Sequence, residues 1–135
     1  MTVLVDTSVW VDHFKNRNDG LVQLLNWDLV LIHPMILAEI ACGTPPAPRQ
    51  RTLGDLGLLP HSHHASIAEV MAFIENKKLY GLGCGFVDIT LLASTMITPG
   101  AKLWTLDKRL EGLAKRFNAN YQPISLGRDT PSVTP

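Results

Sequence analysis

The sequence predicts an α/β fold, in which a single-domain parallel β-sheet of four to five strands carries helices on both faces. Two observations lead to this prediction. Short apolar runs rich in β-branched residues alternate along the chain with segments of helical period, as in strand–helix–strand units. The first run, Val-Leu-Val at residues 3–5, is apolar without alternation, as expected of a central strand covered on both sides.

The N-terminal half is expected to form two strands and four helices. Asp6 ends the first strand, and Thr7 or Ser8 can cap the helix that follows. Asp19 can cap the second helix, and Pro34 suits the first turn of the third. In order, the predicted elements are a strand at 3–5, a helix at 7–14, a helix from 19, a strand at 29–32 and helices at 34–43 and 49–56.

The C-terminal half is expected to add two strands and three helices, two of them separated by a glycine-rich turn at residues 81–85. In order, the predicted elements are a short third strand at 58–59, helices at 65–79 and 87–97, a fourth strand at 102–105 and a helix at 108–117. The domain is expected to cover residues 1–127. Residues 128–135, which include Pro131 and Pro135, are expected to form a loose C-terminal tail.

Four acidic residues in or beside apolar runs are the candidate functional residues: Asp6, Glu39, Asp88 and Asp107. A carboxylate in such surroundings is costly unless it is paired, hydrogen-bonded or bound to a metal. Asp6 and Asp107 follow predicted parallel strands, at whose carboxyl ends ligand sites collect. If the fold gathers all four, their oxygens form a site suited to Mg²⁺ or Mn²⁺.

Each acid also has an ordinary structural interpretation. Asp6, Asp88 and Asp107 stand where helix caps are common. Glu39 can lie at the exposed edge of a short helix, although the residues three and four positions away from it are apolar or small. The set of four therefore indicates a site more strongly than any single member does.

The charge balance is neutral, from 12 basic and 12 acidic residues, which is less basic than a typical nucleic-acid binder. If four acids share one pocket, eight acids remain against 12 basic residues elsewhere, a balance compatible with RNA binding. The candidate RNA contacts, each of which can equally be an ordinary surface charge, are Lys15, Arg17, Arg49, Arg51, Lys108 and Arg109.

Other residue types point away from zinc, disulfides and membranes. Cys42 and Cys84 are too few and too far apart for a zinc site or a disulfide framework, and they suit a reduced, cytoplasmic protein. The histidines at 61, 63 and 64 have no fourth ligand at suitable spacing. No apolar run approaches the ~18 residues of a membrane span, and the N-terminus lacks the pattern of a secretory signal.

The four acids lie in four short motifs. These are Val-Leu-Val-Asp-Thr-Ser-Val-Trp at 3–10, Leu-Ala-Glu-Ile at 37–40, Val-Asp-Ile-Thr-Leu-Leu-Ala-Ser at 87–94 and Leu-Trp-Thr-Leu-Asp at 103–107. In this order and spacing, over nearly the whole chain, the set resembles the PIN-domain ribonucleases, in particular the VapC-type toxins of bacterial toxin–antitoxin pairs. One feature departs from the pattern: many members carry a basic residue in the glycine-rich turn, where this chain has Leu82 and Cys84.

The resemblance implies a PIN-like nuclease domain that cuts within RNA to leave a 5′-phosphate, with Mg²⁺ or Mn²⁺ as cofactor. The catalytic residues would be Asp6, Glu39, Asp88 and Asp107, the metal ligands Asp6, Asp88 and Asp107, and the supporting hydroxyls Thr7, Ser8 and Thr105. The implied partners are an RNA substrate, an antitoxin protein that covers an apolar groove and blocks the acids, and a second copy of the chain in a homodimer. The implied location is cytoplasmic.

Three other classes share part of the pattern. A phosphatase of the haloacid-dehalogenase type needs a second aspartate two residues after the first, where this chain has Ser8. A response-regulator receiver domain needs a lysine just after a late strand, whereas Lys102 precedes the strand. The third alternative is a catalytically inactive PIN-like binding module whose acids are only caps, and such a domain should gain no stability from Mn²⁺.

Overall fold

A three-stranded parallel sheet forms the centre of the molecule, in a computed structural model that describes residues 1–123. The strands are β1 (Thr2–Val5), β2 (Val30–Leu31) and β3 (Ala101–Trp104), and their order in the sheet is β2-β1-β3. Val3 pairs with Val30 on one side and with Lys102 on the other. The side chains at 3–5 have no exposed surface, so the prediction of a central, doubly covered strand is confirmed.

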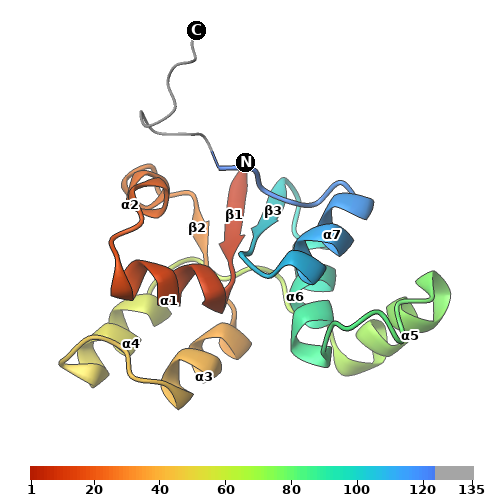
Figure 1. The fold of residues 1–135 in the computed structure, drawn as a ribbon, viewed down its shortest axis with the longest axis horizontal. Helices are drawn as coiled ribbons and strands as arrows, with labels where there is room; N and C mark the ends of the chain where they lie inside the picture. The colour runs from red at the N-terminus through yellow and green to blue at the C-terminus, as the bar shows by residue number, and fades with distance from the viewer. Residues whose placement is uncertain (124–135) are drawn as a thin grey trace, which may run out of the picture.

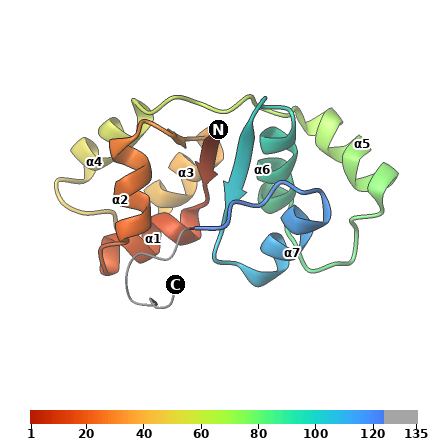
Figure 2. The same ribbon diagram turned by 90° about the horizontal axis from the view of Figure 1, so that it is seen from above.

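Seven helices surround the sheet within the described part of the chain. They are α1 (Thr7–Lys15), α2 (Asp19–Asn26), α3 (Pro34–Cys42), α4 (Arg49–Gly57), α5 (Ile67–Lys77), α6 (Phe86–Met96) and α7 (Lys108–Arg116). The views in Figures 1 and 2 agree in placing α1–α4 on one side of the strands and α5–α7 on the other. The α/β class and the parallel sheet are therefore confirmed.

The number of strands differs from the prediction, because residues 1–123 hold three strands and not four to five. The short third strand predicted at 58–59 is wrong. Leu58 instead ends α4 as its C-cap, with helical backbone angles of φ −82° and ψ −11°. Two apolar residues in succession fit a helix end as well as they fit a strand, and here Leu58 directly follows the helix with 84% of its surface exposed.

Single bridges stand at both edges of the sheet. The bridges are Ile32–His61 beside β2 and Leu103–Asn120 beside β3, both parallel. Pairing does not continue past the first bridge because the next residue of the β2 side in the ladder is Pro34, which has no N–H group and begins α3. Past the second bridge, Pro123 has no N–H group to extend the ladder.

The N-caps of two helices lie one residue before the predicted caps Thr7 and Asp19. The N-cap of α1 is Asp6, but its side chain makes no capping hydrogen bond. Asn18, not Asp19, caps α2, because its Oδ1 accepts from the Leu21 N–H at 3.0 Å. Because Asp6 makes no capping hydrogen bond, its carboxylate is available for other contacts.

None of the helices within residues 1–123 is both long enough and apolar enough to cross a membrane. The predicted domain end at residue 127 and the predicted tail at 128–135 lie outside the described residues.

Candidate active site

Asp6 forms the buried floor of the site, with 6% of its surface exposed. It directly follows β1, and its N–H donates to the Trp104 carbonyl of β3 at 2.9 Å. Its Oδ2 accepts two hydrogen bonds, from Ser8 Oγ at 2.7 Å and from Thr105 Oγ1 at 2.8 Å. Hydrogen bonds of this kind stabilise an ionised carboxylate and fix its direction.

Ser8 and Thr105 also hold the ends of β1 and β3 together. Ser8 Oγ accepts from the Leu106 N–H at 3.0 Å, and Thr105 Oγ1 accepts from the Asp107 N–H at 3.0 Å. The two hydroxyl oxygens lie 3.3 Å apart. Each hydroxyl therefore joins Asp6 to the segment that carries Asp107.

Glu39 lies on the exposed side of α3, whose buried residues include its neighbours Ile36 and Ile40. Its Oε1 accepts from Thr7 Oγ1 at 2.5 Å, which joins α3 to the start of α1. The apolar neighbours suggested a buried glutamate, but the short helix buries only one face and leaves Glu39 outside it.

Asp88, the third residue of α6, is half-buried and connects the four acids electrostatically. Its Oδ2 accepts from the Gly85 N–H at 3.4 Å, a long bond that lowers the pKa of the carboxyl. Burial raises this pKa most, and the charges of the other three acids raise it further. The fold thus brings four acids from separate elements into one region.

Asp107 caps α7, so its cap interpretation is confirmed. Its Oδ1 accepts from the N–H groups of Arg109 and Leu110, at 2.9 and 3.0 Å. Its other carboxylate oxygen accepts no hydrogen bond from residues 1–123. Asp107 can therefore complete the helix end and still offer an oxygen to the site.

The carboxylate oxygens suit a hard divalent cation, but they are not gathered into a ready-made metal site. No ion pair to any of the four acids occurs among the described residues, so their negative charge is not neutralised there. Nor does any group of three or more His, Cys, Asp or Glu side chains in the described range stand ready to hold a metal ion. A bound cation would have to draw the carboxylates closer together.

Four of the six candidate RNA-binding residues lie away from this region or serve other contacts. Arg17 and Lys108 form exposed ion pairs with acids near them in sequence. Arg49 donates to two carbonyls at the end of α3, at 2.6 and 3.2 Å, and so helps to terminate that helix. Arg51 is exposed on α4. The other two, Lys15 and Arg109, lie nearer the acids.

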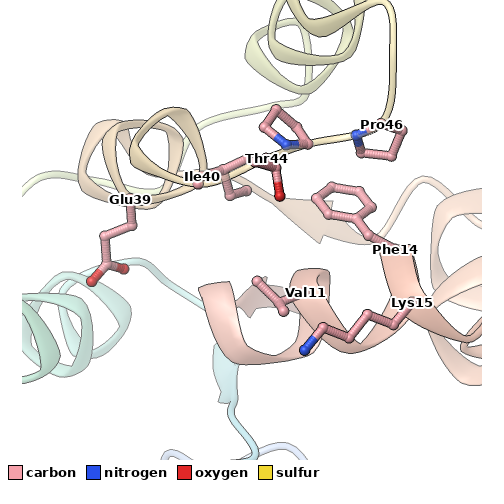
Figure 3. A pocket seen from close by; sticks show the side chains of 9 residues that line it. Val11, Phe14, Lys15, Glu39, Ile40, Thr44 and Pro46 are labelled. Carbon is pink, nitrogen blue, oxygen red and sulfur yellow. The ribbon is translucent and has the colours of Figure 1, made fainter.

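An apolar cavity of about 470 Å³ lies between α1 and α3, next to the site (Figure 3). Its lining consists of Val11, Phe14, Lys15, Glu39, Ile40, Gly43, Thr44, Pro45 and Pro46. Figure 3 shows the Glu39 carboxylate pointing away from the apolar side chains and from Lys15. One residue therefore borders both the cavity and the acidic cluster.

His33, which was not predicted from the sequence to have a role, is 3% exposed and caps α3. Its Nδ1 accepts from the Met35 N–H at 3.0 Å, and its Nε2 lies 3.3 Å from Ser94 Oγ. Burial, followed by the nearby His64 and His61, lowers the pKa of His33 to about 4. The signal that could have revealed this role is the His-Pro pair, a cap residue before a proline in the first helical turn.

Two curated proteins are similar to most of the chain. No protein-family model matches the chain. The chain is 38% identical over 112 residues to Ribonuclease VapC32 of Mycobacterium tuberculosis strain CDC 1551 / Oshkosh, an alignment that covers 81% of this chain and 87% of the relative. The protein of the same name from strain ATCC 25618 / H37Rv gives the same values. With that identity over most of both chains, the protein belongs to the VapC-type PIN-domain ribonucleases.

Proposed function

We propose that this chain is a Mg²⁺- or Mn²⁺-dependent endoribonuclease and the toxin of a type II toxin–antitoxin pair. Two relatives that match most of the chain are named ribonucleases, which supports the activity. The observation that carries the proposal is the acidic cluster around Asp88, in which three further carboxylates raise the pKa of that residue. Such a concentration of negative charge favours a bound cation.

In this proposal Asp6 and Asp88 are the direct metal ligands, while Glu39 and Asp107 complete the shell or orient the attacking water. A divalent cation at this position supplies a water of lowered pKa and neutralises charge on the scissile phosphate. Ser8 and Thr105 fix the direction of the Asp6 carboxylate through the bonds described above.

The substrate proposed is the phosphodiester backbone of RNA, cut to leave a 5′-phosphate. Asp6 is buried, whereas Glu39 and Asp107 are exposed at the rim of the cluster. A phosphate on the outside of a folded RNA can therefore approach the carboxylates from solvent. Which RNA is cut would depend on contacts beyond this cluster.

The nuclease test compares the wild type with Asp6→Asn on structured RNA in the presence of Mg²⁺ or Mn²⁺. Asparagine preserves the size of the side chain but removes the charge, so cleavage should fall on the order of 100-fold or more. The matched control is Asp55→Asn, an exposed acid on α4 outside the cluster, which should cut like the wild type. Equal cleavage by wild type and Asp6→Asn would reject the proposal.

The proposed antitoxin covers the apolar cavity between α1 and α3. Because Glu39 borders that cavity, a protein segment seated there would also reach the acids. Val11 is 39% exposed at the cavity, so a charge can be introduced without disturbing the core. Val11→Asp should abolish co-purification with a co-expressed antitoxin while RNA cleavage persists, and retained co-purification would contradict this placement.

The proposal also includes a homodimer, whose test is the mass of the isolated protein in solution. A mass twice that of the 14.9 kDa chain is expected in sedimentation equilibrium. A single species at the mass of one chain over the whole concentration range would contradict the dimer and leave the nuclease proposal intact.

A further inference from the structure

The side chain of Arg109 packs against Gly83 of the glycine-rich turn, where a larger residue would have to displace it. A methyl group built on Gly83 would lie 2.9 Å from Cδ, 3.0 Å from Nη1 and 3.1 Å from Nε of Arg109. Gly83 also has a φ of +87°, which L side chains rarely adopt. The side chain of Arg109 therefore packs directly on the backbone of Gly83.

The arginine comes from a distant part of the chain. It is the second residue of α7, and its Nη1 lies 3.5 Å from the carbonyl oxygen of Gly83, 26 residues earlier. At this length the hydrogen bond is weak, so the contact between the two residues is chiefly one of packing.

This position brings a positive charge beside the acidic cluster. The N–H of Arg109 donates to the Asp107 carboxylate, and the turn leads directly into the helix that carries Asp88. Burial is the main cause of the raised pKa of the Cys84 thiol. The charges of Asp88 and Asp107 raise this pKa further, whereas the charge of Arg109 lowers it. The two carboxylates and the guanidinium thus surround one point of the turn.

The guanidinium is available for a ligand. It lies on an exposed residue and forms no ion pair with an acid of residues 1–123. Of its five N–H donors, only one is engaged, in the long bond to Gly83. A planar guanidinium with free N–H donors is well suited to bind two oxygens of a phosphate.

We propose that Arg109, held on Gly83, binds a backbone phosphate of the RNA strand next to the acidic cluster. The inference rests on the proposed ribonuclease function. It supplies from α7 the positive charge that the turn itself lacks, since the turn contains Leu82 and Cys84 and no basic residue. Without such a charge, the acids would repel the phosphates on either side of the scissile bond.

The test measures cleavage and RNA binding for Arg109→Ala, Arg109→Lys and Gly83→Ala. The control is Arg116→Ala, an arginine at the other end of α7 that also donates to a backbone carbonyl, that of Lys77 at 3.1 Å. Binding of a fluorescent single-stranded RNA is followed by anisotropy in EDTA, so that no cleavage interferes. Circular dichroism checks that each variant is folded.

Arg109→Ala should raise KM for RNA about tenfold with little change in kcat, and should reduce the slope of log binding constant against log salt by about 0.7, the loss of one phosphate contact. Arg109→Lys should restore the slope but not the whole affinity, because an ammonium lacks the planar fork. Gly83→Ala should act in the same direction, and the double variant with Arg109→Ala should be no weaker than Arg109→Ala alone.

Two results distinguish a failure of the proposed ribonuclease function from a failure of the proposed Arg109 contact. If the wild type fails to cut RNA, the proposed function fails, and that is visible without any Arg109 variant. If the wild type cuts and Asp88→Asn does not, but Arg109→Ala keeps the wild-type KM and salt slope, only the inference is overturned. A change as large in Arg116→Ala would also overturn it.

Discussion

Asp88 is held in a state that costs the folded protein stability. Burial and three neighbouring carboxylates raise its pKa above the value of 3.8 expected in the unfolded chain. For such a group, the folded state binds the proton more tightly, so stability falls as pH rises from 3.8 through the folded pKa. At neutral pH the full cost is present, which is typical of residues kept for function.

Asp88→Asn should therefore raise the melting temperature at pH 7 by a few degrees while it removes cation-dependent cleavage. Asparagine can still accept from the Gly85 N–H, so the helix start is preserved. Thermal unfolding followed by circular dichroism without added metal measures the change. The exposed acid Asp55 serves as control, since Asp55→Asn should leave the melting temperature as it is; a lower melting temperature in Asp88→Asn would contradict the account.

Thr105→Val should destabilise the protein by about 1–3 kcal/mol, because Asp6 loses a donor and the Asp107 N–H loses its acceptor in a buried place. Urea unfolding measures the difference. Thr95→Val is the matched control: Thr95 is equally buried, but its hydroxyl donates only to the Leu91 carbonyl within α6, so the loss should be smaller. Similar losses in both variants would mean that the Asp6 network adds no particular stability.

At the scale of elements, α3 depends on a titratable cap. The neutral ring of His33 accepts from the Met35 N–H, and burial with two neighbouring histidines lowers the His33 pKa from 6.5 to about 4. Above pH 6.5 the histidine is neutral in both the folded and the unfolded chain, so it does not lower the free energy of unfolding. Between pH 6.5 and 4 the unfolded chain binds the proton more tightly, so the free energy of unfolding falls progressively over that range.

Titration of His33 should therefore lower the free energy of unfolding of the wild type by about 2 kcal/mol between pH 6.5 and 4. Each unit of difference between the unfolded and folded pKa corresponds to ~1.4 kcal/mol, and partial solvation of the ring reduces the total. His33→Asn keeps an acceptor at the cap and cannot titrate, so its unfolding free energy should change less over that range. His63→Asn alters an exposed histidine and should keep the wild-type slope. Identical slopes in all three proteins would show that the cap does not titrate as described.

The helices and the strands could be predicted because they have local signals: apolar residues for β1 and β3, and periodic apolar faces for α5 and α7. The residues at 58–59 could not be assigned, since two leucines suit a helix end and a strand alike. The edges of the sheet were also beyond prediction. There only the single bridges Ile32–His61 and Leu103–Asn120 form, between segments distant in the sequence, which no local pattern reveals.

At the scale of the whole molecule, the sequence identified the four acids but not their different environments. Asp6 is buried and hydrogen-bonded, Asp88 is half-buried, and Glu39 is exposed, contrary to its apolar sequence neighbours. The packing of Arg109 on Gly83 was equally hidden, because the two residues meet only when α7 folds against the turn. Residue type predicted the chemistry, and tertiary contacts determined how each residue can take part.

The central claim is that the four carboxylates act together as one cation site. Calorimetric titration with Mn²⁺ at neutral pH tests it most directly, on the wild type, Asp6→Asn, Asp88→Asn and the control Asp55→Asn. We expect wild type and control to bind Mn²⁺ alike and each cluster variant to bind at least about tenfold more weakly. Unchanged Mn²⁺ affinity in Asp6→Asn and Asp88→Asn, or no binding by the wild type, would contradict it.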